Sequence, residues 1–88
     1  MSDLQHAAPA GQTPSTINAM LQQLAANVRR LREELGLTIE DVAPVLELHP
    51  REYERLERGE HDPVDLALLA RLGRALGVDP GELLVAAP

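Results

Sequence analysis

The chain lacks cysteine, lysine, tryptophan and phenylalanine, and Tyr53 is its one aromatic residue. The absence of cysteine excludes a disulfide scaffold, a thiolate zinc site and a cysteine nucleophile, which fits a reducing cytoplasm. A single ring cannot form the aromatic platforms on which single-stranded nucleic acids stack. No apolar run approaches the roughly 18–20 residues of a membrane span, and the N-terminus lacks the basic start and apolar centre of a signal peptide. We therefore expect a cytoplasmic protein with no membrane partner.

Basic residues are outnumbered by acidic ones. The 88 residues carry eight basic side chains, all of them arginine, against fourteen acidic ones, which gives a net charge of −6. This balance excludes a uniformly basic surface for nucleic acid, because binding to phosphates depends on a positive field. The arginines nevertheless concentrate at residues 29–32 and 51–58. A chain of this length predicts one domain with a small core of Leu, Val, Ile and Ala.

The beginning of the chain differs in composition from the rest. Residues 1–12 are rich in Ala, Pro, Gly and Gln without an apolar period, and they are predicted to form a disordered arm before a domain at residues 13–88. Thr13 and Pro14 are typical of a helix start. Apolar residues then recur every three or four positions up to Gly36, which predicts one long amphipathic helix. Its stripe consists of Ile17, Leu21, Leu24, Val28, Leu31 and Leu35.

Shorter helices are predicted after Gly36, each beginning with a capping residue or a proline in its first turn. The helix that Thr38 caps contains Pro44, which removes a backbone hydrogen bond, so it is expected to be short, kinked or partly 3₁₀. No segment alternates with a period of two, so no strand is predicted. The fold class is all-α, with five helices that start at Thr13-Pro14, Thr38-Ile39, His49-Pro50, Asp62-Pro63 and Asp79-Pro80. The apolar faces of the four later helices are Val42, Val45 and Leu46, then Tyr53 and Leu56, then Leu66, Leu69, Leu72 and Leu76, and finally Leu83, Leu84 and Val85.

Residues 24–85 contain the segments LAANVRRLREELGLTIEDVA, LHPREYERLERGEHDP and LALLARLGRALGVDPGELL. In their order and spacing they resemble the Cro/phage-repressor (xenobiotic-response-element) helix-turn-helix family. The landmarks are two arginines on the first helix, Gly-Leu-Thr at the start of the second, Ala43 within it, and Leu-Glu-Arg-Gly at the end of the third. The resemblance implies a five-helix, lambda-repressor-like DNA-binding domain, and the apolar period from Ile17 onward predicts that its first helix is extended. No cofactor and no metal are predicted.

The resemblance also assigns DNA contacts by position, because in this family the third helix lies in the major groove of double-stranded DNA. Arg51 and Arg55 are placed to donate to guanine edges, and Glu52 is placed to accept from a cytosine amino group. Arg58 and the backbone N–H groups at Thr38 are placed at phosphates. The positions assigned to the interface are Thr38, Ile39, His49, Arg51, Glu52, Arg55 and Arg58.

Arg32 and Glu57 match a buried ion pair of the family, which joins the first helix to the end of the third. The implied role is structural. Removing one partner of such a pair typically costs about 3–5 kcal/mol, because a charge is left unpaired in the interior.

Departures from the family pattern, which include Pro44 in the second helix, leave the fold intact and put DNA affinity in question. Ile39 stands where relatives usually have Gln, so it cannot make the hydrogen bond that Gln makes. Glu47 stands where the turn usually has Gly, the residue that most easily adopts a positive φ. Glu60 begins an acidic loop where many relatives place Lys or Arg, and acidic groups there repel phosphate.

The arginines, histidines and carboxylates that were singled out also have simpler structural interpretations. Arg51, Arg55 and Arg58 could form the solvated side of a helix and pair with its neighbouring glutamates, Glu52, Glu54 and Glu57. His49 is expected to cap a helix or contact the backbone, because the histidines lack metal-ligand spacing. No phosphate loop or nucleophile motif accompanies the carboxylates, so an enzyme is not predicted. Two functions stay open: a sequence-specific DNA-binding transcriptional regulator that acts as a homodimer on two half-sites, or an acidic module that binds a protein partner.

Residues 13–23 lie outside the resemblance but continue the apolar stripe of the first helix. Ile17 and Leu21 keep its rhythm, and Met20 widens it. Excess apolar surface favours a partner, so Ile17, Met20 and Leu21 are predicted homodimer contacts. Two alternatives stay open: the segment folds back along its own domain, or the dimer forms through Leu83, Leu84 and Val85.

Overall fold

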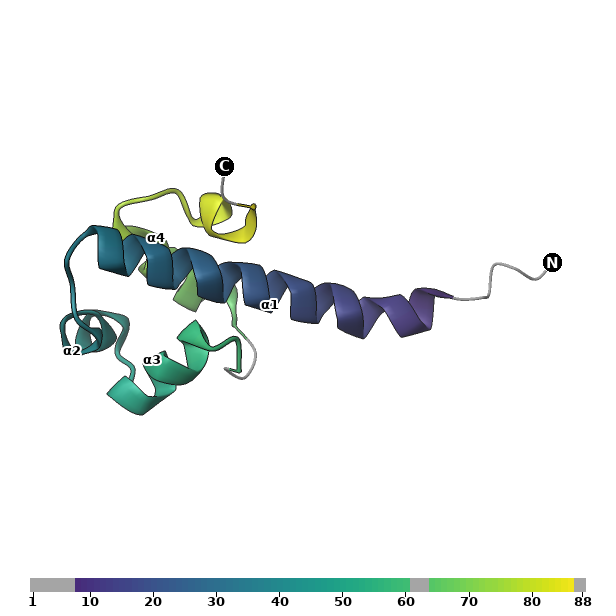
Figure 1. Ribbon diagram of the computed structural model, residues 1–88, viewed down its shortest axis with the longest axis horizontal. Helices are drawn as coiled ribbons and strands as arrows, with labels where there is room; N and C mark the ends of the chain where they lie inside the picture. Colours follow the sequence, from purple (N-terminus) through teal and green to yellow (C-terminus); the bar gives the residue numbers. More distant parts are fainter. Residues whose placement is uncertain (1–7, 61–63, 87–88) are drawn as a thin grey trace.

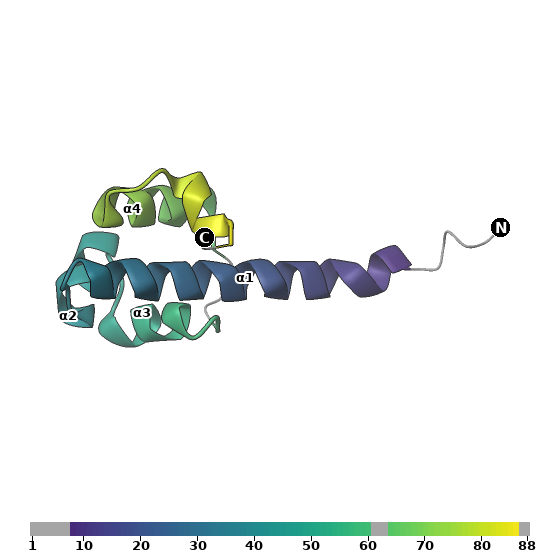
Figure 2. The same ribbon diagram turned by 45° about the horizontal axis from the view of Figure 1, so that its top comes forward.

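The structure, a computed structural model, describes residues 8–60 and 64–86, and over these ranges it is helical without a strand (Figure 1). The α-helices are α1 (Ala8–Glu34), α2 (Ile39–Val42), α3 (Pro50–Glu57) and α4 (Leu66–Leu76). The 3₁₀ helix η2 (Ala43–Leu46) follows α2, and the 3₁₀ helix η3 (Pro80–Leu84) follows α4. Figures 1 and 2 show α3 and η3 on opposite sides of α1. Within the described ranges, no helix is both long and apolar enough to cross a membrane.

The N-terminal half of α1 projects beyond the rest of the domain (Figures 1 and 2). The helix begins at Ala8, earlier than the cap at Thr13 predicts, so residues 8–12 of the predicted arm are helical. The rest of that arm, residues 1–7, lies outside the described residues. Among the side chains described from Thr16 onward, the first buried one is Leu24. From Thr16 to Gln23, α1 therefore has no fully buried side chain.

Pro44 divides the second predicted helix, as expected. The α-helical part ends at Val42, and the chain continues as η2 with Pro44 in its first turn. Glu47 closes η2 with a φ of 61° and a ψ of 34°, which is the left-handed conformation. All other positive φ angles among the described residues belong to glycines. The turn before α3 is therefore strained at the position where the sequence has Glu in place of Gly.

Replacing Glu47 with Gly is expected to stabilise the protein by about 1 kcal/mol, because a side chain with a Cβ makes the left-handed conformation about 1–2 kcal/mol less favourable. In a domain of this size, that gain raises the melting temperature by about 4–8 °C. The ion pair that the substitution removes is weak, since the exposed carboxylate of Glu47 lies 4.0 Å from Arg71. Glu47→Ala is the matched control, because it removes the same carboxylate and keeps the strained φ. Equal melting temperatures for the two variants contradict this interpretation.

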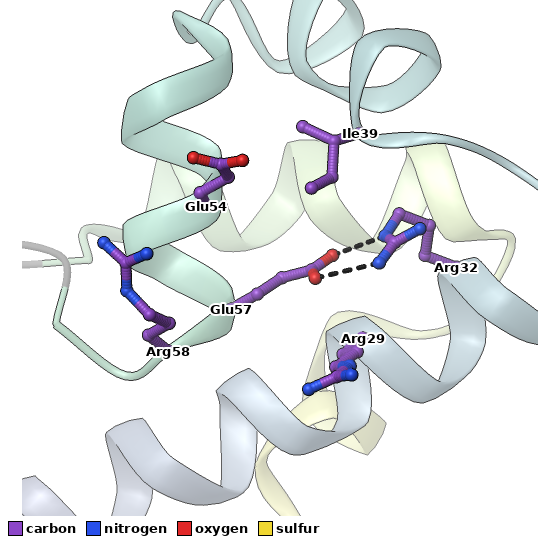
Figure 3. A pocket seen from close by; sticks show the side chains of 6 residues that line it. All are labelled: Arg29, Arg32, Ile39, Glu54, Glu57 and Arg58. Carbon is purple, nitrogen blue, oxygen red and sulfur yellow. Dashed lines mark hydrogen bonds and ion pairs between the residues drawn. The ribbon is translucent and has the colours of Figure 1, made fainter.

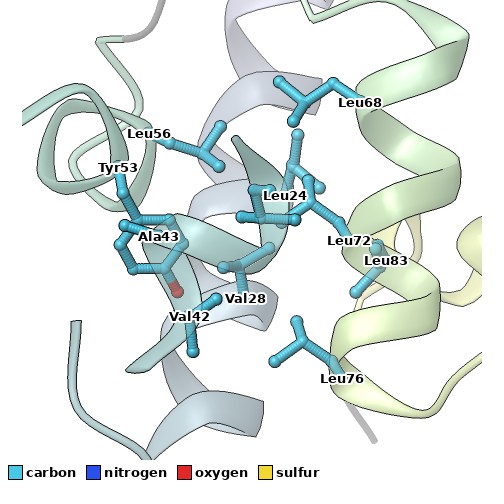
Figure 4. Packing of buried hydrophobic residues seen from close by; sticks show 11 residues of the cluster. Leu24, Val28, Val42, Ala43, Tyr53, Leu56, Leu68, Leu72, Leu76 and Leu83 are labelled. Atoms are coloured by element: carbon cyan, nitrogen blue, oxygen red, sulfur yellow. The ribbon is translucent and has the colours of Figure 1, made fainter. Parts of the chain in front are cut away.

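One hydrophobic core joins the helices (Figure 4). Leu24 and Val28 contribute from α1, and Tyr53 contributes a fully buried ring from α3. Leucine, valine and alanine supply the rest, as the composition predicts. The cluster consists of Leu24, Val28, Val42, Ala43, Leu46, Tyr53, Leu56, Leu68, Leu72, Leu76 and Leu83.

Apart from Ile17 and Val85, which were also considered as dimer contacts, three apolar residues of the predicted helix faces are exposed. Leu35, Val45 and Leu66 have exposed fractions of 52%, 59% and 82%. Leu35 follows the last residue of α1, and Leu66 is the first residue of α4. Val45 lies in η2, where three residues per turn replace the α-helical period. The predictions for Leu35 and Val45 were wrong because the α-helical period was continued past the end of α1 and through a 3₁₀ segment. The prediction for Leu66 was wrong because the buried residues of α4 are Leu68, Leu72, Gly73 and Leu76.

The start of α4 depends on Asp65. Its carboxylate accepts a hydrogen bond from the backbone N–H of Leu68 at 2.8 Å, and Gly77 ends the helix with a φ of 75°. Asp62 and Pro63, which were predicted to begin this helix, lie outside the described residues. The cap is therefore Asp65, three residues after the predicted start.

The predicted fifth helix is the 3₁₀ helix η3, so the described residues contain four α-helices. Asp79 caps η3 by accepting a hydrogen bond from the N–H of Gly81 at 2.9 Å. Pro80 and Gly81 are the two poorest helix formers, and they occupy its first two positions. With only five residues, η3 is too short to offset that cost as an α-helix.

The side chain of Asn27 on α1 makes hydrogen bonds to the end of the described chain. Its buried amide nitrogen donates to the carbonyl oxygens of Leu83 and Val85, both at 2.8 Å. Its amide oxygen accepts a hydrogen bond from Arg30 at 3.2 Å. Sequence patterns did not predict this role, because the two carbonyl partners lie 56 and 58 residues away. Asn27 thus holds η3 on the side of α1 opposite α3.

Candidate nucleic-acid interface

α3 is the helix to which the sequence assigns base contacts, and His49 builds its start. The Nδ1 atom of His49 accepts a hydrogen bond from the backbone N–H of Arg51 at 3.2 Å. The Glu52 carboxylate accepts from the backbone N–H of His49 at 2.9 Å. Pro50 occupies the first helical position, where a missing N–H has no cost. His49 therefore caps the helix, and a contact from Glu52 to a base has to compete with this cap.

Three arginines share the exposed side of α3. Arg51, Arg55 and Arg58 follow one another at steps of four and three, which places them on one face of a helix. All three are largely solvent-accessible, whereas Tyr53 and Leu56 enter the core from the opposite side. Because those two residues are buried, the arginines on the opposite face of the helix point into solvent.

The partners of these arginines are not the neighbouring glutamates of α3. Arg55 donates to the backbone oxygen of Glu60 at 3.1 Å, and Arg58 Nε donates to the Glu60 carboxylate at 3.3 Å. The side chain of Arg51 has no hydrogen-bond or ion-pair partner in the described part of the chain. Among the described residues, these arginines therefore make no contact with Glu52, Glu54 or Glu57, which is the pairing that the simpler interpretation expects.

Two reciprocal hydrogen bonds between Thr38 and Asp41 cap the start of α2. The Thr38 hydroxyl accepts from the N–H of Asp41 at 3.0 Å, and the Asp41 carboxylate accepts from the N–H of Thr38 at 2.9 Å. The hydrogen bonds from the backbone and side chain of Thr38 lower the pKa of Asp41, so this carboxylate is ionised at neutral pH. The N–H of Thr38 that was predicted to hold a phosphate is therefore already bonded to a negative charge.

Arg32 of α1 and Glu57 at the end of α3 form a two-pronged ion pair (Figure 3). The Nε of Arg32 donates to one carboxylate oxygen at 2.6 Å and its Nη2 to the other at 3.0 Å. The side chains are only 13% and 7% exposed. A further donor of Arg32, Nη1, bonds to the carbonyl oxygen of Leu37 at 2.9 Å. The hydrogen bond to Glu57 raises the pKa of Arg32, and the pair joins α1, α3 and the loop before α2.

The hydroxyl of Tyr53 lies near this pair. Among the described residues it is the one buried side-chain polar atom without a hydrogen-bond partner. Burial raises the pKa of Tyr53, and the neighbouring Glu57 carboxylate raises it further. The hydroxyl therefore stays neutral, and the contribution of Tyr53 to stability comes from the packing of its ring.

A hollow of about 210 Å³ opens beside the ion pair (Figure 3). Arg58 and Glu54 reach it from α3, Arg29 reaches it from α1, and Ile39 borders it at the start of α2. Arg29 is exposed and pairs with Glu33 at 3.3 Å. No role was assigned to Arg29 from the sequence, because the resemblance assigned one only to Arg32 within the arginine cluster at 29–32. The lining residues are Arg29, Arg32, Ile39, Glu54, Glu57 and Arg58.

The residues predicted to contact a second copy lie on the projecting half of α1. Ile17 and Met20 are 52% and 46% exposed, and Leu21 is half-buried. Because α1 is continuous from Ala8 to Glu34, this segment does not fold back along its own domain. On the alternative C-terminal surface Leu83 is buried, whereas Val85 is 58% exposed.

Metal-ligating side chains do not gather in the described ranges, where no group of three His, Asp or Glu could hold an ion. His49 is used as a helix cap. His61 lies outside the described residues.

The chain is similar in sequence to a known domain family. A family model described as a helix-turn-helix domain matches residues 23–86. The match begins near Leu24, where α1 enters the core, so the projecting turns of α1 lie outside it. Among curated proteins, none matches the chain.

Several solved structures of transcription regulators have a fold similar to that of this chain. A hypothetical transcription factor, NHTF, from Neisseria is 27% identical with a TM-score of 0.70, and the similarity covers 76% of each chain. The restriction-modification controller protein C.AhdI from Aeromonas hydrophila is 32% identical with a TM-score of 0.66, over 72% of this chain and 94% of that one. The clp gene regulator ClgR from Corynebacterium glutamicum is 31% identical with a TM-score of 0.68, over 74% of this chain and 68% of that one.

Proposed function

The chain belongs to the Cro and phage-repressor type of the helix-turn-helix family of DNA-binding transcription regulators, and from this we propose that it binds an operator of two half-sites as a homodimer. In this proposal α3 enters the major groove of each half-site. The observation that carries the proposal is the row of three arginines on the outer face of α3, above all Arg51, whose side chain has no partner within the described residues.

Base edges and phosphates are contacted by different arginines in this proposal. Arg51 and Arg55 read base edges, because the guanidinium fork can donate two hydrogen bonds to guanine O6 and N7. Arg58 and Arg29, which both line the hollow between α1 and α3, bind phosphates.

In this proposal, the remaining predicted interface positions act by holding α2 and α3 in place. Thr38 and His49 hold helix starts, and Glu52 completes the cap of α3. Ile39, which has no hydrogen-bonding side chain, borders the hollow. We therefore expect their substitution to affect binding through the position of α2 and α3.

The proposal is tested by selecting a preferred site from a random DNA pool and then changing one arginine. Arg51→Ala is expected to weaken binding to the selected site by about 1–3 kcal/mol, or roughly 5- to 150-fold, and to relax the preference at one base pair. Arg74→Ala, which removes an exposed arginine from α4, is the matched control. Affinity is measured by fluorescence anisotropy for the selected site and for every single-base variant of it.

Two results oppose the proposal at different levels. An equal loss on all DNA sequences places Arg51 among the phosphate contacts and contradicts its role in base readout. If the folded chain is not retained on heparin or on random-sequence DNA at low salt, the function as a DNA-binding regulator is wrong, because phosphate contacts give a steep salt dependence. The acidic protein-binding module is then the remaining function.

A further inference from the structure

The turn after α3 brings Glu60 back against the helix. Gly59 makes this reversal with a φ of 73°, and a Cβ at Gly59 would collide with the side chain of Gln22 on α1. The N–H of Glu60 then donates to the carbonyl oxygen of Arg55 at 2.8 Å. Glu60 is thus held by the backbone at the C-terminal end of α3.

In this position one residue engages two of the three arginines on α3. The carboxylate of Glu60 accepts from Arg58 Nε at 3.3 Å, and its backbone oxygen accepts from Arg55 Nη2 at 3.1 Å. The ion pair with Arg58 is exposed on both sides, at 58% and 59%. Exposed pairs stabilise a fold by only about 0–1 kcal/mol, so this contact matters little for stability. The contact places the Glu60 carboxylate at the guanidinium group of Arg58, which is the group that binds a DNA phosphate in the proposed complex.

We propose that Glu60 is an intramolecular competitor of DNA phosphate, which acts through Arg58 and sets the affinity of α3 for DNA below the level that its arginines alone provide. This inference rests on the proposed function. When DNA binds, the phosphate competes with the Glu60 carboxylate for the guanidinium group of Arg58, and the carboxylate remains close to the DNA backbone. Glu60 therefore weakens binding to every sequence alike, since phosphate contacts carry no sequence information.

Two readouts separate this role from a structural one. Glu60→Gln keeps the size of the side chain and removes its charge, and it is expected to tighten binding about two- to fivefold on both the selected site and random-sequence DNA. The slope of log affinity against log salt is expected to become more negative by up to about one, because Arg58 gains a full phosphate contact. A structural role moves the melting temperature and leaves the salt slope unchanged.

The control is an acidic residue on the other side of α1. Glu82→Gln removes the same charge from η3, which Figures 1 and 2 show opposite α3, and it is expected to change affinity by less than about twofold. Glu60→Gln is also combined with Arg58→Ala, and the gain is expected to shrink in that background, because the competed arginine is absent. Binding is measured by anisotropy on double-stranded DNA at roughly 50–200 mM salt.

Each outcome has a defined meaning. If Glu60→Gln and Glu82→Gln change affinity equally, the inference is overturned while the proposed function stands. If the gain persists undiminished with Arg58→Ala, Glu60 does not act through Arg58, and the inference as stated is wrong. If the wild-type chain and Glu60→Gln are both folded and neither binds DNA at low salt, the proposed function fails and the inference fails with it.

Discussion

Arg32→Ala is expected to lower the free energy of unfolding by about 3–5 kcal/mol, because it leaves the carboxylate of Glu57 buried without its cation. Glu57 is only 7% exposed and accepts both of its strong hydrogen bonds from Arg32. The same substitution removes the donor to the carbonyl oxygen of Leu37. Since small domains have a total stability of about 5–15 kcal/mol, a loss of this size is readily measured by urea denaturation followed by circular dichroism.

A double-mutant cycle shows whether the pair is the cause. Glu57→Ala is expected to cost a similar amount, and Arg32→Ala with Glu57→Ala is expected to cost less than the sum, because neither charge is then left alone. Tyr53→Phe is the control beside the pair, and it is expected to leave stability unchanged or slightly higher, because it removes a buried hydroxyl that has no partner among the described residues. Strict additivity of the two alanine substitutions contradicts a coupled pair.

Local signals predicted much of the fold, because caps and helix ends depend on residues close in sequence. Thr38 and His49 occupy the cap positions that the sequence assigns to helix starts. The predicted disturbance at Pro44 is the change from α2 to η2. The same local method failed for the fifth helix, because periodicity does not distinguish an α-helix from a 3₁₀ turn of five residues.

The candidate site was predicted only where residue identity determines the contact. The row of arginines on α3 follows from helical spacing once Tyr53 and Leu56 are recognised as core residues. The contacts of Glu60 with Arg55 and Arg58 could not be predicted, because they depend on the reversal of the chain at Gly59. Similarly, the hollow that includes Arg29 forms only when α1, α2 and α3 are packed together.

Ile17→Glu combined with Met20→Glu is expected to convert a homodimer into a monomer and to weaken binding to a two-half-site operator by about a hundredfold or more. Both side chains are about half exposed on a helix that is continuous from Ala8 to Glu34. A second copy can cover them by packing its own α1 alongside, which buries apolar surface that the core does not use. At about 1.5 Å per residue, the 27 residues of α1 span about 40 Å, comparable with the roughly 34 Å between successive half-sites.

The effect of the added charge is separated from the effect of removing apolar surface by a matched variant. Asn18→Glu combined with Ala19→Glu adds the same two charges to exposed positions that do not lie three or four residues from Ile17 or Met20, and this variant is expected to remain dimeric. Sedimentation equilibrium measures the mass of each variant, and anisotropy compares one half-site with two. Binding of Ile17→Glu with Met20→Glu to a single half-site is expected to match that of the control variant, because α3 is unchanged and only the link between two copies is broken. If this variant stays dimeric at the same concentrations as the unaltered chain, the contact through α1 is wrong, and the exposed Val85 beyond η3 marks the alternative surface.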